Sequence, residues 1–143
     1  ILLDSPYKFE AGTQNIAGVL GFYEALKFIN SIGYDKIHET EISLYLYLKK
    51  ELERISEIEF YNDIEQTIGS LSFNVKGINH EDIGILLDKQ HILVRCGHHC
   101  AQPIMKHLNI EGTIRVSLCL YNDKYDINKF IKALNKAIEI LRE

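Results

Sequence analysis

The sequence has no long apolar run, few prolines and few cysteines, and these scarcities exclude several classes of protein. No uninterrupted apolar segment of the 143 residues approaches the roughly 18 residues needed to cross a bilayer. No basic, then apolar, then small-residue signal opens the chain, so we expect neither a membrane protein nor an exported one. The only prolines are Pro6 and Pro103, and the cysteines are Cys96, Cys100 and Cys119. Three thiols cannot all pair internally, which favours free thiols, catalysis or metal binding over a structural disulfide.

An excess of basic residues is missing as well. The chain has 16 lysines and arginines against 20 acidic residues, a formal charge of -4, and its lysines are scattered among glutamates. Binding to a phosphate backbone relies on a basic stripe, so nucleic acid is not an expected partner. A composition of 46% apolar and 25% charged residues is typical of one soluble globular domain. We expect a cytoplasmic protein, or one from an organelle of bacterial origin.

Two kinds of periodicity predict the secondary structure. Helical spacing and boundary residues predict helices over 15–32, from Asp35 to about 55, over 79–90, after Pro103, and from Asp126 onward. Apolar and polar residues alternate in SLSFNVK (70–76) and TIRVSLCLY (113–121), and EIEFY (57–61) is the expected neighbour of the first of these strands. A small sheet packed with helices follows, which is an α+β arrangement.

The segment RCGHHC (95–100) is the densest group of chemically versatile side chains. Structural zinc usually takes two well-separated pairs of ligands, whereas these cysteines and histidines are all local. Adding His107 and Cys119 produces no familiar zinc spacing. Zinc binding is therefore the weaker interpretation.

Cys100 is better interpreted as a nucleophile. It lies just before the helix that Pro103 opens, where free N–H groups and the helix dipole stabilise a thiolate, and Arg95 would add to this effect. The alternative is a small apolar residue in a turn, which the polar surroundings argue against. Cys96 is expected to fill space, and Cys119 to be a strand residue without a charged neighbour.

Arg115 stands in the middle of a strongly apolar alternating strand. Burying an arginine there is costly unless its guanidinium meets a carboxylate or a phosphate. The residue pattern leaves two interpretations open: a clamp for a ligand carboxylate in a pocket, or an ordinary salt bridge to one of the acidic residues.

Three segments together resemble one enzyme family. VRCGHHCAQPIM resembles the R-x-G-H-H-C-A-x-P segment of group II, SufS-type cysteine desulfurases, which are pyridoxal-phosphate (PLP) enzymes of fold type I. KFEAGTQN resembles the family's F-E-A-G-T-P-N segment, with Gln14 in place of proline, and IRVSLCLYN resembles its R-x-S-x-x-x-Y-N strand. The order and intervals of the three segments fit over essentially the whole chain.

The resemblance implies a domain organisation. The chain resembles the C-terminal third of a class V aminotransferase-like enzyme: residues 1–14 as a remnant of the large domain, 15–34 as a connecting helix, and 35–143 as the small α+β domain. The family's Schiff-base lysine lies in the large domain, so no lysine here is assigned that role. We therefore expect the isolated chain to be inactive.

The resemblance also implies residue roles. The full enzyme would convert L-cysteine to L-alanine and leave a persulfide on Cys100 for iron–sulfur cluster assembly. Arg115 matches the arginine that binds the substrate carboxylate, and Arg95 matches a second arginine near the same site. Thr13 matches the threonine that reaches the PLP phosphate of the neighbouring subunit, which implies a homodimer. No metal ligand is assigned.

The resemblance also bears on the sulfur acceptor, and two rival functions stay open. Enzymes that serve zinc-containing SufU scaffolds carry a histidine before the aspartate that matches Asp82, where this chain has Glu81, with His80 adjacent. A SufE-like acceptor is therefore expected. The rival functions are a selenocysteine lyase of the same family and a non-catalytic module in which the cysteine and histidine cluster holds zinc.

Overall fold

The computed structural model describes residues 3–61 and 69–143 and divides the chain into two compact units, Ile1–Lys36 and Ile37–Glu143. The first unit contains a short 3-10 helix, η1 (Tyr7–Phe9), and helix α1 (Ile16–Ile32). The side chain of Asn15 caps α1 by accepting a hydrogen bond from the Gly18 N–H. Gly33 ends it with a φ of 92°, a backbone conformation that suits glycine. The predicted helix over 15–32 is confirmed.

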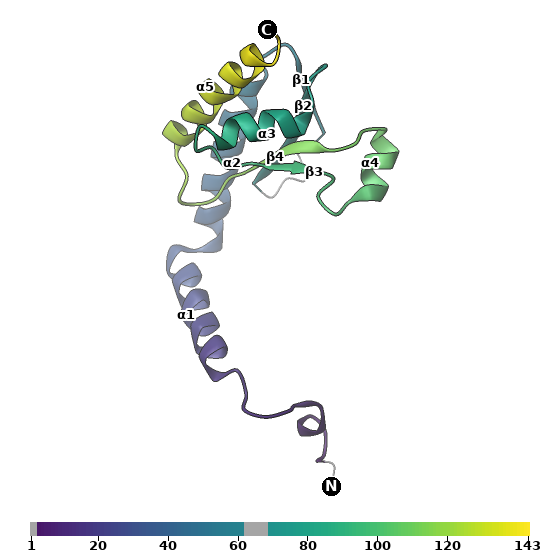
Figure 1. Cartoon of the computed structure of the whole chain (residues 1–143). Helices are drawn as coiled ribbons and strands as arrows, with labels where there is room; N and C mark the ends of the chain where they lie inside the picture. Colours follow the sequence, from purple (N-terminus) through teal and green to yellow (C-terminus); the bar gives the residue numbers. More distant parts are fainter. Residues whose placement is uncertain (1–2, 62–68) are drawn as a thin grey trace. The chain divides into compact units, whose positions relative to one another are not determined.

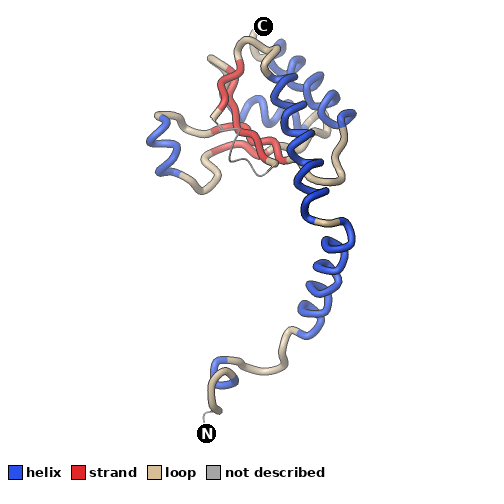
Figure 2. The backbone as a smooth tube through the Cα atoms, turned by 180° about the vertical axis from the view of Figure 1, so that it is seen from behind, coloured by secondary structure: helices blue, strands red, loops and turns tan. Residues whose placement is uncertain are grey.

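The second unit is built on a four-stranded antiparallel sheet, seen in red in Figure 2. Its strands are β1 (Ile58–Phe60), β2 (Ser70–Val75), β3 (Arg95–Gly97) and β4 (Thr113–Ser117), in the order β1-β2-β4-β3. The predicted strand at 70–76 and its neighbour at 57–61 are confirmed. The strand predicted over 113–121 stops at Ser117. The prediction that Cys119 is a strand residue is therefore wrong. There the chain turns, and the Cys119 N–H bonds to the Asn122 side chain at 3.0 Å.

Helices cover the apolar face of this sheet (Figure 1). They are α2 (Tyr34–Leu52), α3 (His80–Asp88) and α5 (Lys124–Ile140), whereas the short α4 (Gln102–Leu108) lies beyond the ends of β3 and β4. Apolar side chains with no more than 2% exposure form the centre of the core: Tyr45, Leu48, Leu52, Leu71, Phe73, Val75, Ile83, Leu87, Ile114, Ile127, Leu134 and Ala137. The α+β prediction is confirmed.

Two predicted helix starts are wrong, for reasons visible in the capping. Helix α2 begins at Tyr34, so Asp35 lies in its first turn and is not its cap. Helix α5 begins at Lys124 and not at Asp126. Asp123 accepts hydrogen bonds from the backbone of the first turn, and the Asp126 carboxylate reaches back to the Asp123 N–H, which completes a capping box.

The sheet separates an apolar face from a polar one. Along β2, Leu71, Phe73 and Val75 are buried while the alternate residues are half-buried, as a period of two requires. The register continues this division across the sheet, because Phe73 lies opposite Ile114 and Ile114 lies opposite Cys96. The alternate positions on β2, β4 and β3 form the polar face, which carries Ser72, Asn74, Thr113, Arg115 and Arg95.

Within the described ranges, no helix combines the length and the apolar character that crossing a membrane requires.

Candidate active site

The centre of the polar face is a pair of arginines on neighbouring strands. Arg95 on β3 lies directly opposite Arg115 on β4, and Ser72 on β2 lies opposite Arg115 from the other side. Directly opposed residues of an antiparallel pair have Cβ atoms about 5 Å apart, and like charges in this position are destabilising. The register therefore places two positively charged side chains next to each other on the polar face, where a bound anion would offset their repulsion.

Arg115 has no carboxylate partner within the described residues. Its side chain is half-buried, and its Nε atom is buried without a hydrogen-bond partner. No described acidic side chain lies within 4.0 Å of it or of Arg95. Among these residues no salt bridge accounts for Arg115, and its role as a clamp for a ligand carboxylate stays a prediction.

Cys100 lies in the turn that leads from β3 into α4. Its thiol is free and its side chain is exposed. Pro103 occupies the first turn of α4, as predicted, and Ala101 is the N-cap. Both His99 and Cys100 have left-handed backbones, with φ of 55° and 56°. This conformation costs an L-residue roughly 1–2 kcal/mol, so other contacts must hold the turn.

The two histidines of the turn make different contacts. The ring of the exposed His98 accepts a hydrogen bond from the Cys100 N–H, with 3.0 Å between N and Nδ1. The ring of His99 reaches the sheet instead, with 2.8 Å between Nε2 and the Thr113 hydroxyl oxygen. Thr113 is only 1% exposed and lies on the polar face, two residues from Arg115. The turn of Cys100 is thereby attached to the strand that carries Arg115.

Sequence reasoning missed Thr113 as a site residue. Its neighbour Gly112 shows why this corner is tight, because a Cβ there would lie 2.7 Å from the Gly97 carbonyl carbon and 2.5 Å from His80 Nε2. A glycine and a hydroxyl residue at the start of a strand were the only signals, and neither points to His99 without the strand register.

The other two cysteines have surroundings unlike those of Cys100. Cys96 is half-buried on the apolar face, and a Cβ built on Gly84 of α3 would lie 2.6 Å from its sulfur. Burial, and then the negative charge of Glu81, raise the pKa of the Cys96 thiol. A thiol with a raised pKa is a poor nucleophile at neutral pH. Cys119 is half-buried in the turn after β4.

Thr13 belongs to the first unit, in the loop between η1 and α1, where its side chain is exposed. Its predicted contact with a PLP phosphate stays a prediction. In the part of the chain that the structure describes, no three His, Cys, Asp or Glu side chains are grouped to hold a metal ion.

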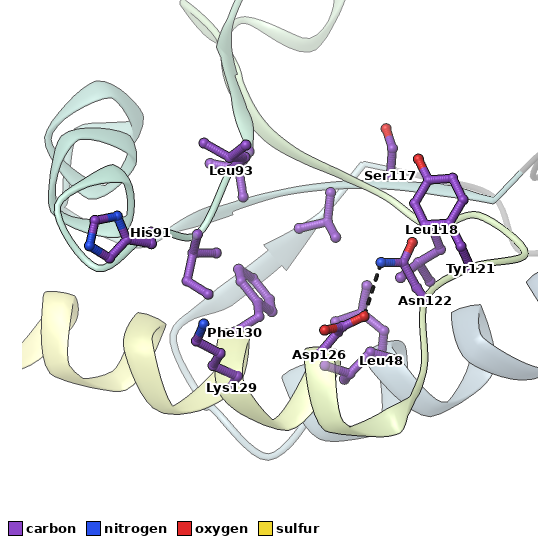
Figure 3. A pocket seen from close by; sticks show the side chains of 14 residues that line it. Leu48, His91, Leu93, Ser117, Leu118, Tyr121, Asn122, Asp126, Lys129 and Phe130 are labelled. Atoms are coloured by element: carbon purple, nitrogen blue, oxygen red, sulfur yellow. Dashed lines mark hydrogen bonds between the residues drawn. The ribbon is translucent and has the colours of Figure 1, made fainter.

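A pocket of about 380 Å³ lies elsewhere in the second unit, between the 91–94 segment, the end of β4 and α5 (Figure 3). Within it the Asn122 amide donates a hydrogen bond of 3.1 Å to Asp126. Neither Cys100 nor the two arginines line this pocket, so the cysteine turn does not open into it.

Comparison with known proteins places the fold and its sequence in a family. Residues 1–130 match the family model for aminotransferase class-V proteins. The chain belongs to the aminotransferase class-V family. A probable cysteine desulfurase of Staphylococcus aureus (strain Mu50 / ATCC 700699) is 40% identical to it over 137 residues, which cover 95% of this chain and 33% of that protein.

Two solved structures of cysteine desulfurases are similar to this chain. The apo cysteine desulfurase of Thermococcus onnurineus NA1 is 34% identical, with a TM-score of 0.88 over 99% of this chain and 36% of that one. The cysteine desulfurase CsdA of Escherichia coli is 32% identical, with a TM-score of 0.88 over 97% of this chain and 34% of that one. The chain thus spans about a third of the length of the relatives it matches.

Proposed function

We propose that this chain is part of a PLP-dependent cysteine desulfurase, which converts L-cysteine to L-alanine and keeps the sulfur as a persulfide on Cys100. One observation carries the proposal: an exposed free thiol sits in a turn attached to the strand of Arg115, whose guanidinium has no carboxylate partner among the described residues. The cysteine desulfurases among the relatives support the same reaction.

The proposed reaction balances without an external oxidant. The C–S bond of the substrate breaks, and an S–S bond to Cys100 forms. When the S–S bond forms, the two sulfur atoms together lose two electrons, and these electrons reduce the substrate carbon. The carbon also takes up a proton and becomes the methyl group of alanine. A protein thiol that is exposed and held in one position suits this attack.

Arg115 would bind the substrate carboxylate. A guanidinium recognises a carboxylate through two parallel N–H···O bonds, which fixes the orientation of the amino acid as well as its position. Arg95, opposite on β3, would add positive charge to the same side of the sheet. The repulsion between the two arginines would fall when the carboxylate binds.

The described residues do not fit PLP by themselves. Strands β2, β3 and β4 carry no lysine, and Thr13 offers only one hydroxyl for the phosphate. When bound, PLP supplies the electron withdrawal that makes the substrate sulfur open to attack. We therefore propose that the 143-residue chain alone is inactive. From the family resemblance at Thr13 we also propose that the intact enzyme is a homodimer, in which Thr13 reaches the phosphate of the neighbouring subunit.

The acceptor of the sulfur is proposed to be a SufE-like protein that serves iron–sulfur cluster assembly. The support is Glu81, at the position where enzymes that serve SufU carry a histidine. Glu81 lies exposed in the first turn of α3, with its N–H bonded to the cap residue Asn79.

Alanine production from L-cysteine tests the proposed function. In the PLP-loaded enzyme that contains this chain, Cys100→Ala should lose most of the persulfide-dependent turnover, and the matched Cys119→Ala variant should keep it. Equal loss in the two variants, or full retention in Cys100→Ala, would contradict the assignment. A visible absorbance band and turnover from the 143-residue chain mixed with PLP would refute its proposed inactivity.

A further inference from the structure

The turn that carries Cys100 holds an unfavourable backbone at two neighbouring positions, His99 and Cys100. Neither residue is glycine, and left to itself each would prefer a negative φ. A change of φ at either position would swing the Cys100 side chain to another direction. Whatever holds these two residues therefore decides where the thiol points.

Two kinds of hydrogen bond hold the turn. Inside it, the Cys100 N–H bonds to the ring of His98, and the Ala101 N–H bonds to the His98 carbonyl oxygen at 2.8 Å. These bonds move with the turn as one body. The bond from His99 Nε2 to Thr113 is of the second kind, because it joins the turn to a buried residue of β4.

The environment of His99 lowers the pKa of its ring and so favours the neutral form. Burial lowers its pKa most, the Arg115 charge lowers it next, the contact with Thr113 acts in the opposite direction, and the charges of Arg95 and His80 lower it further. Its Nδ1 atom is buried without a partner in the described residues. A bare lone pair is better tolerated in the positive field of Arg115 than a bare N–H, so we infer that the proton lies on Nε2 and that the Thr113 hydroxyl oxygen accepts the hydrogen bond.

We propose that His99 is the positioning residue of Cys100, holding the thiol in its exposed orientation by donating a hydrogen bond to Thr113. This inference rests on the proposed function only in taking Cys100 as the sulfur-accepting residue. His99 is not itself a catalytic residue, because it acts through the backbone of the turn.

Amide hydrogen exchange in the 143-residue chain tests the proposal, with matched variants on both sides of the bond. His99→Leu and Thr113→Val remove the donor and the acceptor at similar size, while His99→Gln and Thr113→Ser retain an N–H and a hydroxyl. We expect the first two to raise exchange at Cys100 and Ala101 by about fivefold, the usual effect of one lost hydrogen bond. The second two should stay near the wild-type rate.

The double variant His99→Leu/Thr113→Val gives the sharpest result. Because each single change breaks the same bond, the double variant should exchange no faster than either single variant. Unchanged exchange in both single variants, or effects that multiply in the double variant, would overturn the positioning role. Exchange in the core of α5 identifies any variant that fails to fold, and the Gln and Ser variants then decide.

Kinetics of the PLP-loaded enzyme separate this inference from the proposed function. His99→Leu should lower kcat while leaving KM for cysteine unchanged, since the arginines bind the substrate, and His99→Gln should restore kcat. A rise in KM with unchanged kcat would overturn the positioning role. A wild-type enzyme that leaves no sulfur on Cys100 would refute the proposed function, while the exchange result would stand.

Discussion

The contact between Gly84 and Cys96 yields a prediction in which one substitution changes sign with its background. Gly84 lies within α3, where alanine in place of glycine normally stabilises a helix by about 1 kcal/mol. Here the added Cβ would lie 2.6 Å from the Cys96 sulfur but 3.5 Å from the Cys96 Cβ. Overpacking of this kind costs about 1–3 kcal/mol. Gly84→Ala should therefore lower the free energy of unfolding by up to about 2 kcal/mol.

Removing the sulfur should reverse this effect. In Cys96→Ala the nearest atom is the Cβ at 3.5 Å, an ordinary van der Waals contact, so Gly84→Ala should now raise the free energy of unfolding by about 1 kcal/mol. Urea unfolding followed by circular dichroism measures all four proteins, and the coupling energy should be about 1–3 kcal/mol. Gly21→Ala in α1 is the control, because its Cβ would meet nothing within 4 Å. An equal effect of Gly84→Ala in both backgrounds would refute the packing argument.

Three further predictions concern Arg115, His99 and the N-terminal cap of α5. Arg115→Lys keeps the charge but loses the two-pronged carboxylate contact, so KM for cysteine should rise about 10- to 100-fold in the PLP-loaded enzyme; an unchanged KM in steady-state kinetics would contradict the clamp. The pKa of His99 is lower in the folded chain, so below about pH 6.5 the unfolded state binds a proton more readily. The contribution of His99 to the free energy of unfolding is therefore complete above about pH 6.5 and is lost as the pH falls below it. Urea titrations should therefore show a flatter pH course in His99→Gln, and parallel courses would count against it. Asp123→Ala should cost about 1 kcal/mol through loss of the capping box, whereas the exposed Lys129→Ala should change little; equal urea midpoints would argue against the cap.

Local periodicity predicted most of the elements, because a half-buried strand and an amphipathic helix impose periods of two and 3.6 residues on the sequence. The strand at 70–76 and the helix at 15–32 are examples. Element ends were harder, since they depend on single hydrogen bonds. The Asp123 and Asp126 side chains start α5 earlier than the apolar stripe does, and Asn122 helps to end β4 early.

The candidate site was predictable in its residue types but not in its arrangement. Cys100 and Arg115 stand out locally, one by its polar neighbours and the other by its apolar ones. That Arg95 faces Arg115, and that His99 meets Thr113, follows from the pairing of β3 with β4. Which strands pair, and in which register, depends on the assembled sheet and on the turns that connect its strands, and the local spacing of residues within one strand does not determine it.

The most direct test of the central claim is to locate the sulfur after a single turnover. The PLP-loaded enzyme that contains this chain would be mixed with one equivalent of L-cysteine, quenched with an alkylating reagent, digested and analysed by mass spectrometry. Peptides carrying Cys96, Cys100 and Cys119 would be measured in the same sample. The account predicts one additional sulfur atom on Cys100 and none on the other two. Alanine formed with the sulfur on Cys96 or Cys119, or on no residue of this chain, would contradict it.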